Sequence, residues 1–262
     1  MSTLFIVGGG LFGSLAAACA RSKGIEAVIF DAALDGAASH AAAGLFAENW
    51  IGKKLRDHYQ RALPLLERLY EIRPVSFRRD DGHSETFLCV PPAAILEPAP
   101  MRERVTAVGD GWLEAGGRRY EGWVYVAAGV WCEQFLPGLG VHGKAGASFD
   151  FPGEREARIR RLDSHHQAIA FVRDSGTTFF SDGTAEREYT PEHDRHTLER
   201  AAAMGLTSEP VQRRLGRRPY TPGGPVFRKL GSRTWLATGG RKTGTILGAS
   251  FARQLVEQEL GK

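Results

Sequence analysis

The chain has 262 residues, which is long enough to bury a sizeable core as one large domain or two small ones. Its 42% of hydrophobic residues, its mean hydropathy of −0.26 and the lack of an unbroken apolar run of about eighteen residues argue against a transmembrane helix. The net charge of +4 is only mildly basic, and no aromatic residues interleave with the arginine clusters, so we expect no nucleic-acid partner.

The cysteines and the N-terminus bear on the compartment. Cys19, Cys89 and Cys132 lie far apart and form no C-x-x-C pair, so buried reduced thiols are expected in place of disulfides or a zinc site, and no metal is predicted. The first apolar segment leads straight into a glycine-rich turn without a basic leader. We therefore expect no secretory signal and a cytoplasmic protein.

Residues 5–21 predict a strand, a tight turn and a helix. The apolar run at 5–7 is of strand type, and Gly8, Gly10 and Gly13 form the pattern G-x-G-x-x-G at the start of an alanine-rich helix over 11–21. In a dinucleotide site, Gly8 permits the turn, Gly10 lets the backbone approach a pyrophosphate, and Gly13 allows the helix to pack closely on the strand. A glycine turn without a ligand is the alternative.

Asp31 strengthens the nucleotide interpretation. It ends a second apolar strand over 27–30 and lies 23 residues after Gly8, where a carboxylate accepts hydrogen bonds from ribose hydroxyls. The same carboxylate repels a 2′-phosphate. The residues therefore favour FAD or NAD(H) over NADP(H).

The rest of the chain alternates between helices and groups of short strands. A small-residue loop (36–46) precedes an amphipathic helix (53–70), and further helices are expected at 191–204 and 244–260. Strand patterns occur at 75–79, 85–90, 104–108, 112–120, 123–129, 147–151, 167–174, 177–184 and 235–240. Helices thus bracket β-rich segments, which predicts a nucleotide domain interrupted by a separate β-sheet domain.

Four segments in the same order along the chain resemble the FAD-dependent D-amino-acid oxidase superfamily, which includes glycine oxidase and sarcosine oxidase. The first is the glycine fingerprint with Asp31, where the family more often has Glu. The second and third are ASHAAAGLF (38–46) and WVYVAAGVW (123–131). The last combines GRRPYTPGGPVF (216–227) with LATGGRKTGTILGASFARQL (236–255).

The resemblance implies an α/β fold in which a smaller antiparallel β-sheet substrate domain interrupts a Rossmann-like FAD-binding domain. We assign residues 1–73, 99–140 and 218–262 to the FAD-binding domain, and residues 74–98 and 141–217 to the substrate or cap domain. The stretch between 70 and 104 is shorter than in typical members. A trimmed substrate domain either admits a large substrate or is completed by a partner subunit.

The implied activity is the oxidation of an amine or amino acid, with hydride transfer to flavin N5 and hydrolysis of the imine product. The substrate is a small-molecule or protein-borne amine. Two alternatives stay open. The chain is a flavoprotein subunit of a multi-chain amine or opine dehydrogenase, or it is a catalytically idle FAD-binding scaffold.

The resemblance also places residues at the cofactor. They are Gly8, Gly10, Leu11, Phe12, Gly13, Asp31, Ala38, Ser39, His40, Ala42, Ala43, Gly44, Leu45, Val105, Ala128, Gly129, Trp131, Gly240, Arg241, Lys242, Thr243, Gly244 and Thr245. His40 lies one residue before the position at which some relatives attach flavin covalently, and segment 239–244 contains no cysteine. Non-covalent FAD is expected.

Arg218, Tyr220 and Lys242 are the candidate catalytic residues. Arg218 precedes a proline, as does the family's arginine that contacts the flavin or a substrate carboxylate; a structural arginine that bridges two strands is the alternative. Tyr220 binds a substrate carboxylate or simply packs. Lys242, near the start of the last helix, either stabilises negative charge at flavin N1 and C2=O or points to solvent.

Overall fold

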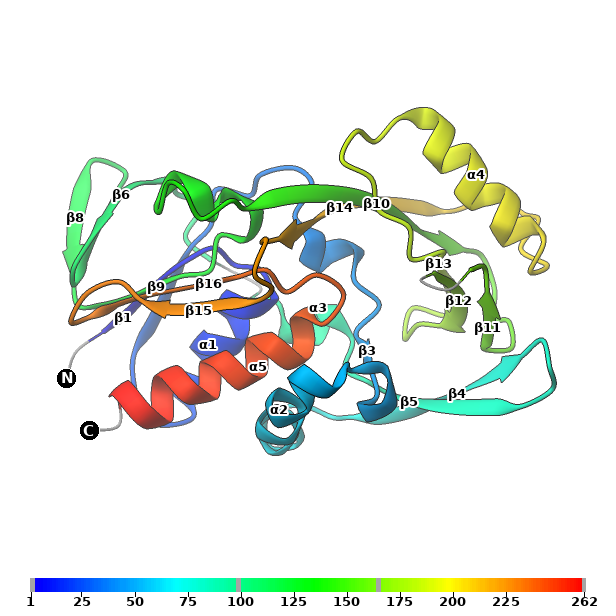
Figure 1. Ribbon diagram of the computed structural model, residues 1–262, viewed down its shortest axis with the longest axis horizontal. Helices are drawn as coiled ribbons and strands as arrows, with labels where there is room; N and C mark the ends of the chain where they lie inside the picture. The colour runs from blue at the N-terminus through cyan, green and yellow to red at the C-terminus, as the bar shows by residue number, and fades with distance from the viewer. Residues whose placement is uncertain (1–2, 98–99, 164–165, 261–262) are drawn as a thin grey trace.

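The computed structural model describes residues 3–97, 100–163 and 166–260, and Figure 1 shows how the elements are arranged. One sheet contains five strands in the order β15-β16-β9-β1-β2. These strands are β1 (Leu4–Val7), β2 (Ala27–Phe30), β9 (Trp123–Val126), β15 (Val226–Lys229) and β16 (Thr234–Thr238). The pairs β1/β2, β1/β9 and β9/β16 are parallel, whereas β15 is antiparallel to β16.

The two faces of this sheet pack against different elements because successive strand side chains point in opposite directions. Leu4 and Ile6 of β1 join the core formed with α1 (Leu11–Arg21) and α5 (Gly244–Leu255). Phe5 and Val7 pack on the other face. That face is covered by the antiparallel strands β6 (Val105–Gly109), β7 (Trp112–Ala115) and β8 (Arg118–Glu121).

The second sheet has eight strands in the order β14-β10-β13-β12-β11-β4-β5-β3. Its pairs are antiparallel except for β4/β11. The strands are β3 (Leu45–Phe46), β4 (Arg73–Arg79), β5 (Ser84–Cys89), β10 (His142–Phe151), β11 (Arg158–Arg161), β12 (Gln167–Val172), β13 (Thr178–Ser181) and β14 (Gln212–Tyr220). The predicted α/β fold, a Rossmann-like sheet accompanied by a mostly antiparallel one, is confirmed.

The four predicted helices are present, with small differences at their ends. The helix over 11–21 is α1, and the helix expected at 53–70 is α2 (Arg56–Leu69), preceded by a 3-10 turn, η3 (Lys53–Leu55). The helix at 191–204 is α4 (Pro191–Ala202). The last helix, α5, ends at Leu255 and continues as a π-helical turn, η5 (Val256–Leu260). Short helices also occur as α3 (Pro92–Ile95), η1 (Ala38–Ala41), η2 (Glu48–Trp50) and η4 (Gly129–Gln134).

Strand β14 was not assigned from the sequence, although it pairs with β10 over nine residues. The segment contains Pro219 and four arginines, and neither residue type favours a central strand. The strand is tolerated because it lies at the edge of the sheet, where a missing N–H does not interrupt a ladder on both sides.

The assigned domain boundaries stay a prediction. Strand β3 falls inside the range given to the FAD-binding domain but pairs with β5, and Ile95 of α3 packs in the core with α1. Cys19, Cys89 and Cys132 are all buried and free. Within the described ranges, no helix is long and apolar enough to cross a membrane.

Candidate active site

A cavity of about 610 Å³ lies where elements of both sheets meet. The first sheet contributes the ends of β1 and β9, the N-terminus of α1 and the loop before α5. The second sheet contributes residues of β12, β13 and β14, and η1 lies between the two groups. Both sheets therefore supply the wall of one cavity, whose volume is within the range of small-molecule and cofactor sites.

The fingerprint glycines are required by close backbone approaches. Gly8 has φ of +104°, and a Cβ built on it would lie 2.6 Å from the Ala127 carbonyl oxygen. A Cβ on Gly13 would lie 1.9 Å from the Gly8 carbonyl oxygen, so only glycine lets α1 pack this closely. At Gly10 the nearest atom would be Ser39 Oγ at 2.8 Å, which belongs to a movable side chain.

The N-terminus of α1 presents unpaired donors to the cavity. Leu11 N donates to Ser39 Oγ at 2.8 Å, and Ser14 N donates to the Gly10 carbonyl at 2.9 Å. Between them, the N–H groups of Phe12 and Gly13 have no hydrogen-bond partner among the described residues. Unpaired N–H groups at the positive end of a helix are suited to an anion such as a pyrophosphate.

Asp31 is held in place by backbone donors. Its Oδ2 accepts from Gly9 N at 2.6 Å, and its Oδ1 accepts from Ala33 N at 2.7 Å. A carboxylate offers about four lone-pair sites, so these two bonds leave acceptor capacity on the cavity side. Asp31 therefore both shapes the glycine turn and stays able to accept hydrogen bonds from a ribose.

The small-residue loop is fixed to the second sheet by a buried cluster of charges. The Ala42 carbonyl accepts from Arg173 Nη2 at 3.1 Å. Arg173 Nε lies 3.6 Å from Asp150 Oδ1, and Asp150 Oδ2 accepts from Arg214 Nη2 at 2.6 Å. The Arg173 guanidinium also lies over the Phe179 ring, 4.3 Å from its centroid. These contacts set the height of the loop above the cavity.

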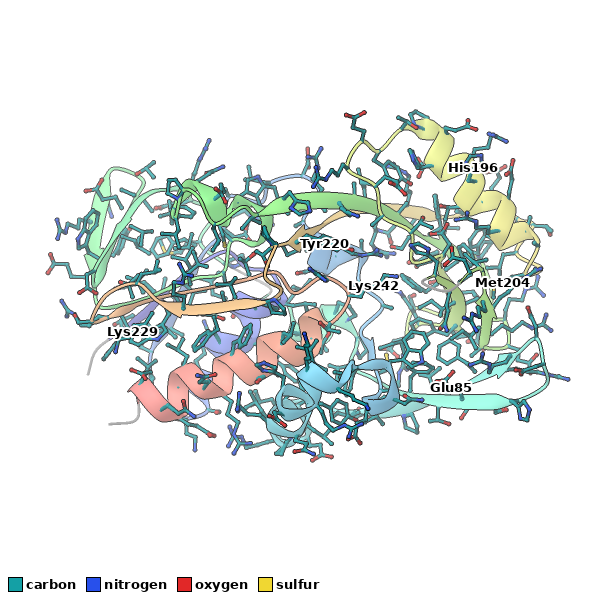
Figure 2. The ribbon with its side chains drawn as sticks, viewed as in Figure 1. Glu85, His196, Met204, Tyr220, Lys229 and Lys242 are labelled. Atoms are coloured by element: carbon teal, nitrogen blue, oxygen red, sulfur yellow. The ribbon has the colours of Figure 1, made fainter. Side chains whose placement is uncertain are left out.

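The loop before α5 turns its two basic residues in different directions. Arg241 has φ of +46°, its Nη2 donates to the Thr221 carbonyl at 3.3 Å, and its guanidinium lies 5.1 Å from the centre of the Tyr220 ring. Tyr220 also stacks on His142. Figure 2 shows Lys242 and Tyr220 near the middle of the molecule.

Arg218 and Lys242 approach the same turn of the second sheet. Arg218 Nη1 donates to the carbonyls of Gly183 and Thr184 at 3.1 and 3.2 Å. Lys242 Nζ would lie 3.3 Å from a Cβ built on Gly183. Burial lowers the pKa of Arg218, and burial together with the nearby Arg218 charge lowers the pKa of Lys242, although much of the Lys242 side chain remains exposed.

Asp182 supports this turn from beneath. Its Oδ1 accepts from the backbone N and Oγ1 of Thr184 at 3.0 and 2.7 Å. Its Oδ2 accepts from Thr197 Oγ1 at 3.0 Å and from Arg200 Nη1 at 2.6 Å, both on α4. These bonds and the Arg200 charge hold the pKa of the buried Asp182 low despite desolvation. The carboxylate is thus fully engaged.

The structure gathers most of the predicted site residues around this cavity. Those that line it are Gly8, Gly10, Leu11, Phe12, Asp31, Ala38, Ser39, Ala42, Ala43, Gly44, Leu45, Val105, Ala128, Gly129, Trp131, Arg218, Gly240, Arg241, Lys242, Thr243, Gly244 and Thr245. Gly13, His40 and Tyr220 are not among the lining residues. Gly13 packs against Gly8, His40 is exposed, and Tyr220 contacts Arg241.

Several contributors were missed in the sequence. Arg173 and Asp150 hold the small-residue loop, and the Gly183 and Thr184 carbonyls bind Arg218. The available signal was the sequence Asp-Gly-Thr at the end of a strand, since an Asp two residues before a Thr forms a local turn. Nothing in the sequence connects that turn to Arg218, which lies more than thirty residues away.

The sheet order and the cavity define a Rossmann-like α/β protein in which a second, mostly antiparallel sheet contributes to the wall of the same cavity. Three solved structures share this fold. The chain is 17% identical to an iminodiacetate oxidase from Chelativorans sp. BNC1, with a TM-score of 0.74 and coverage of 98% of this chain and 95% of the other. It is 13% identical to a glycine oxidase from Bacillus cereus ATCC 14579, with a TM-score of 0.76 and coverage of 100% of this chain and 95% of the other. It is 11% identical to an L-proline dehydrogenase from P. horikoshii, with a TM-score of 0.76 and coverage of 98% of this chain and 93% of the other.

These likenesses show the fold, which is the one that the resemblance predicted. No protein-family model matches the chain. No curated protein matches it at the level of sequence. The chain therefore has the fold of the amino-acid oxidases and dehydrogenases to which it is similar, and its activity has to be argued from its own cavity.

Proposed function

We propose that the protein binds FAD non-covalently and oxidises an amine or amino acid. The observation that carries this proposal is the presence, in one cavity, of a helix N-terminus suited to an anion and of the half-buried Arg218. Phe12 lies at one wall with an N–H group that has no partner among the described residues, and Arg218 lies at the wall made by the second sheet. The fold shared with a glycine oxidase and an iminodiacetate oxidase agrees with this assignment.

The residues present fit the cofactor. A methyl group on Gly8 or Gly13 would collide with backbone atoms, so the tight turn requires glycine at both positions. The N-terminus of α1, which follows Gly10, would face the pyrophosphate of the cofactor. Asp31 would accept from the ribose. His40 is exposed, and the three buried cysteines lie outside the cavity lining. Among the described residues, no histidine or cysteine lines the cavity from which a covalent bond to the flavin would form.

Bound FAD would supply the capacity to accept a hydride from the carbon next to nitrogen. The substrate loses that hydride and one proton from nitrogen, which gives an imine. Addition of water to the imine then yields a carbonyl compound and releases the amine. Arg218 would bind the carboxylate of an amino acid, because its planar guanidinium matches a carboxylate with two parallel hydrogen bonds.

Anaerobic reduction of the purified yellow protein by a panel of amines and amino acids tests the proposal. We expect at least one compound to bleach the flavin absorbance near its visible maximum. Acid precipitation should release the yellow colour into the supernatant. A colourless protein that does not take up added FAD would contradict the cofactor assignment, and a yellow protein that no amine reduces would favour a scaffold or an electron-transfer subunit.

A further inference from the structure

Two cations from different sheets converge on one glycine. Arg218 belongs to β14 of the second sheet, and its Nη1 lies 3.1 Å from the Gly183 carbonyl oxygen. Lys242 follows β16 of the first sheet, yet its Nζ reaches across to the same residue, 3.3 Å from a Cβ built on Gly183. Both side chains line the cavity. The cavity wall at Gly183 therefore carries two positive charges.

Neither charge is neutralised by a carboxylate. Among the described residues, neither Arg218 nor Lys242 forms an ion pair. The carboxylates that act on Lys242 from a distance are Asp182 and Asp163. Asp182 is bonded to Arg200 and Asp163 to His166, so each is engaged with another group. The Arg218 guanidinium is desolvated beside a second positive charge, and an anionic ligand would offset both the desolvation and the repulsion between the two cations.

Both cations keep donors for such a ligand. The two hydrogens of Arg218 Nη1 go to the Gly183 and Thr184 carbonyls, whereas Nε and Nη2 make no hydrogen bond to the described residues. That edge is the fork that binds a carboxylate with two parallel bonds. Lys242 Nζ makes no hydrogen bond to the described residues either, while the neighbouring Arg241 is committed to Thr221 and Tyr220.

We infer that the substrate is an amine that carries two carboxylates, one held by the fork of Arg218 and the other by Lys242. This inference rests on the proposed amine oxidation. A substrate with a single carboxylate engages only one of the two cations, whereas a dicarboxylate pairs with both. The amine nitrogen and its adjacent carbon then lie between the two anchors, beside the cofactor wall.

The test compares two pairs of probes on the FAD-loaded protein under anaerobic conditions. Iminodiacetate is compared with sarcosine, and aspartate with alanine, each amino acid in both enantiomers, by the apparent Kd for flavin reduction. Succinate and butyrate, which carry no amine, are compared by the shift that they cause in the flavin spectrum. We expect each dicarboxylate to bind about tenfold or more tightly than its monocarboxylate counterpart.

Variants at position 242 identify the second anchor. Lys242→Met removes the charge at similar length and should bring the ratio of the two affinities close to one, whereas Lys242→Arg should restore the preference. Lys23→Met is the matched control, because Lys23 is exposed just after the C-terminus of α1, whereas the cavity lies at the N-terminus of that helix. This control variant should keep the preference for dicarboxylates. Thermal melts of each variant verify folding.

The outcomes separate this inference from the proposed function. Equal affinities in the unaltered protein, or equal losses for both ligand types in Lys242→Met, would overturn the two-carboxylate site. A changed flavin reduction potential in Lys242→Met with the ligand preference intact would place Lys242 at the flavin edge and would also overturn it. If no amine reduces the flavin but succinate binding depends on Lys242, the amine-oxidation proposal fails and the dicarboxylate site stands.

Discussion

At the scale of single residues, two fingerprint glycines can be told apart by what they contact. We expect Gly13→Ala to destabilise the fold by roughly 3 kcal/mol or more, because its methyl group would meet the Gly8 carbonyl oxygen at 1.9 Å. Gly10→Ala should stay within about 1 kcal/mol of the unaltered protein, since only the movable Ser39 hydroxyl is in the way. Its methyl group should instead weaken FAD binding.

Urea denaturation of the FAD-free protein and titration with FAD measure the two effects separately. A Gly10→Ala protein with full FAD affinity would show that the pyrophosphate does not approach that backbone. Equal stabilities for the two variants would show that α1 can move away from the turn.

Asp31 gives a second prediction at this scale. Asp31→Ala should weaken FAD binding by about 10- to 100-fold, because charge-assisted hydrogen bonds worth about 1.5 to 3 kcal/mol are lost. Part of this loss comes from the Gly9 amide, which would lose its acceptor. Asp35→Ala in the same exposed loop is the control. Fluorescence titration measures both, and an unchanged affinity in Asp31→Ala would remove Asp31 from the ribose site.

At the scale of elements, Arg173 joins the second sheet to η1. Arg173→Met should speed FAD dissociation by roughly tenfold, since the bond to the Ala42 carbonyl is charge-assisted and worth about 1.5 kcal/mol. Asp150 keeps Arg214 as its partner, so the sheet itself should remain folded. Arg158→Met, an exposed change on β11, serves as the control. A dissociation rate equal to that of the control would show that η1 needs no such anchor.

Asp110 joins two turns and predicts a pH dependence. It accepts from Ser232 N, Ser232 Oγ and Arg233 N at 2.8 Å each, and these bonds lower its pKa from 3.8 to about 2. A carboxyl whose pKa is lowered on folding stabilises the protein above its unfolded value, and that contribution is lost as the pH falls from about 4 to 2.

Asp110→Asn should therefore melt at a lower temperature than the unaltered protein at neutral pH, and the difference in Tm should shrink as the pH is lowered through this range. Calorimetry at several pH values provides the measurement. Asp35→Asn supplies the comparison for a general loss of negative charge. A difference in Tm that does not vary with pH would mean that the negative charge of Asp110 does not strengthen its hydrogen bonds to Ser232 and Arg233.

At the scale of the whole molecule, both sheets line one cavity, so FAD should stabilise them together. At a concentration of 100 times its Kd, a ligand that binds only the folded state adds about 2.7 kcal/mol. For a chain of this size, that corresponds to a rise in Tm of roughly 5 to 11 °C. Calorimetry and flavin fluorescence should report one coincident transition. Two transitions, of which FAD shifts only one, would show that the sheets unfold independently.

The extent of what the sequence predicts also depends on scale. Helices with a regular apolar period and strands of aromatic and β-branched residues, such as α1 and β9, follow from local patterns. The glycine turn and Asp31 were expected to lie together for the same reason, because they belong to one short segment, and they line the same part of the cavity. Strand β14 was missed because its arginines and Pro219 contradict strand propensity, and only its position at a sheet edge allows it.

The part of the cavity at Gly183 was less predictable because its geometry depends on residues far apart in the chain. Arg218 and Lys242 were named singly, but their meeting at Gly183 depends on the packing of one sheet against the other. The support that Asp182 receives from α4 has no local signature either. A motif identifies a residue that is able to act, whereas only the fold shows what it acts beside.

The linkage between α4 and Gly183 connects a helix outside the cavity to the cavity wall. Asp182 ties Thr197 and Arg200 of the helix to the turn whose carbonyls orient Arg218. Helix α4 packs on one face of the second sheet, and Figure 1 shows it far from the first sheet. A binding module or a light-sensitive group grafted onto that helix would pull on the turn through the ion pair between the partly exposed Arg200 and the buried Asp182. Substrate choice could then be tuned by engineering without altering any atom of the cavity wall.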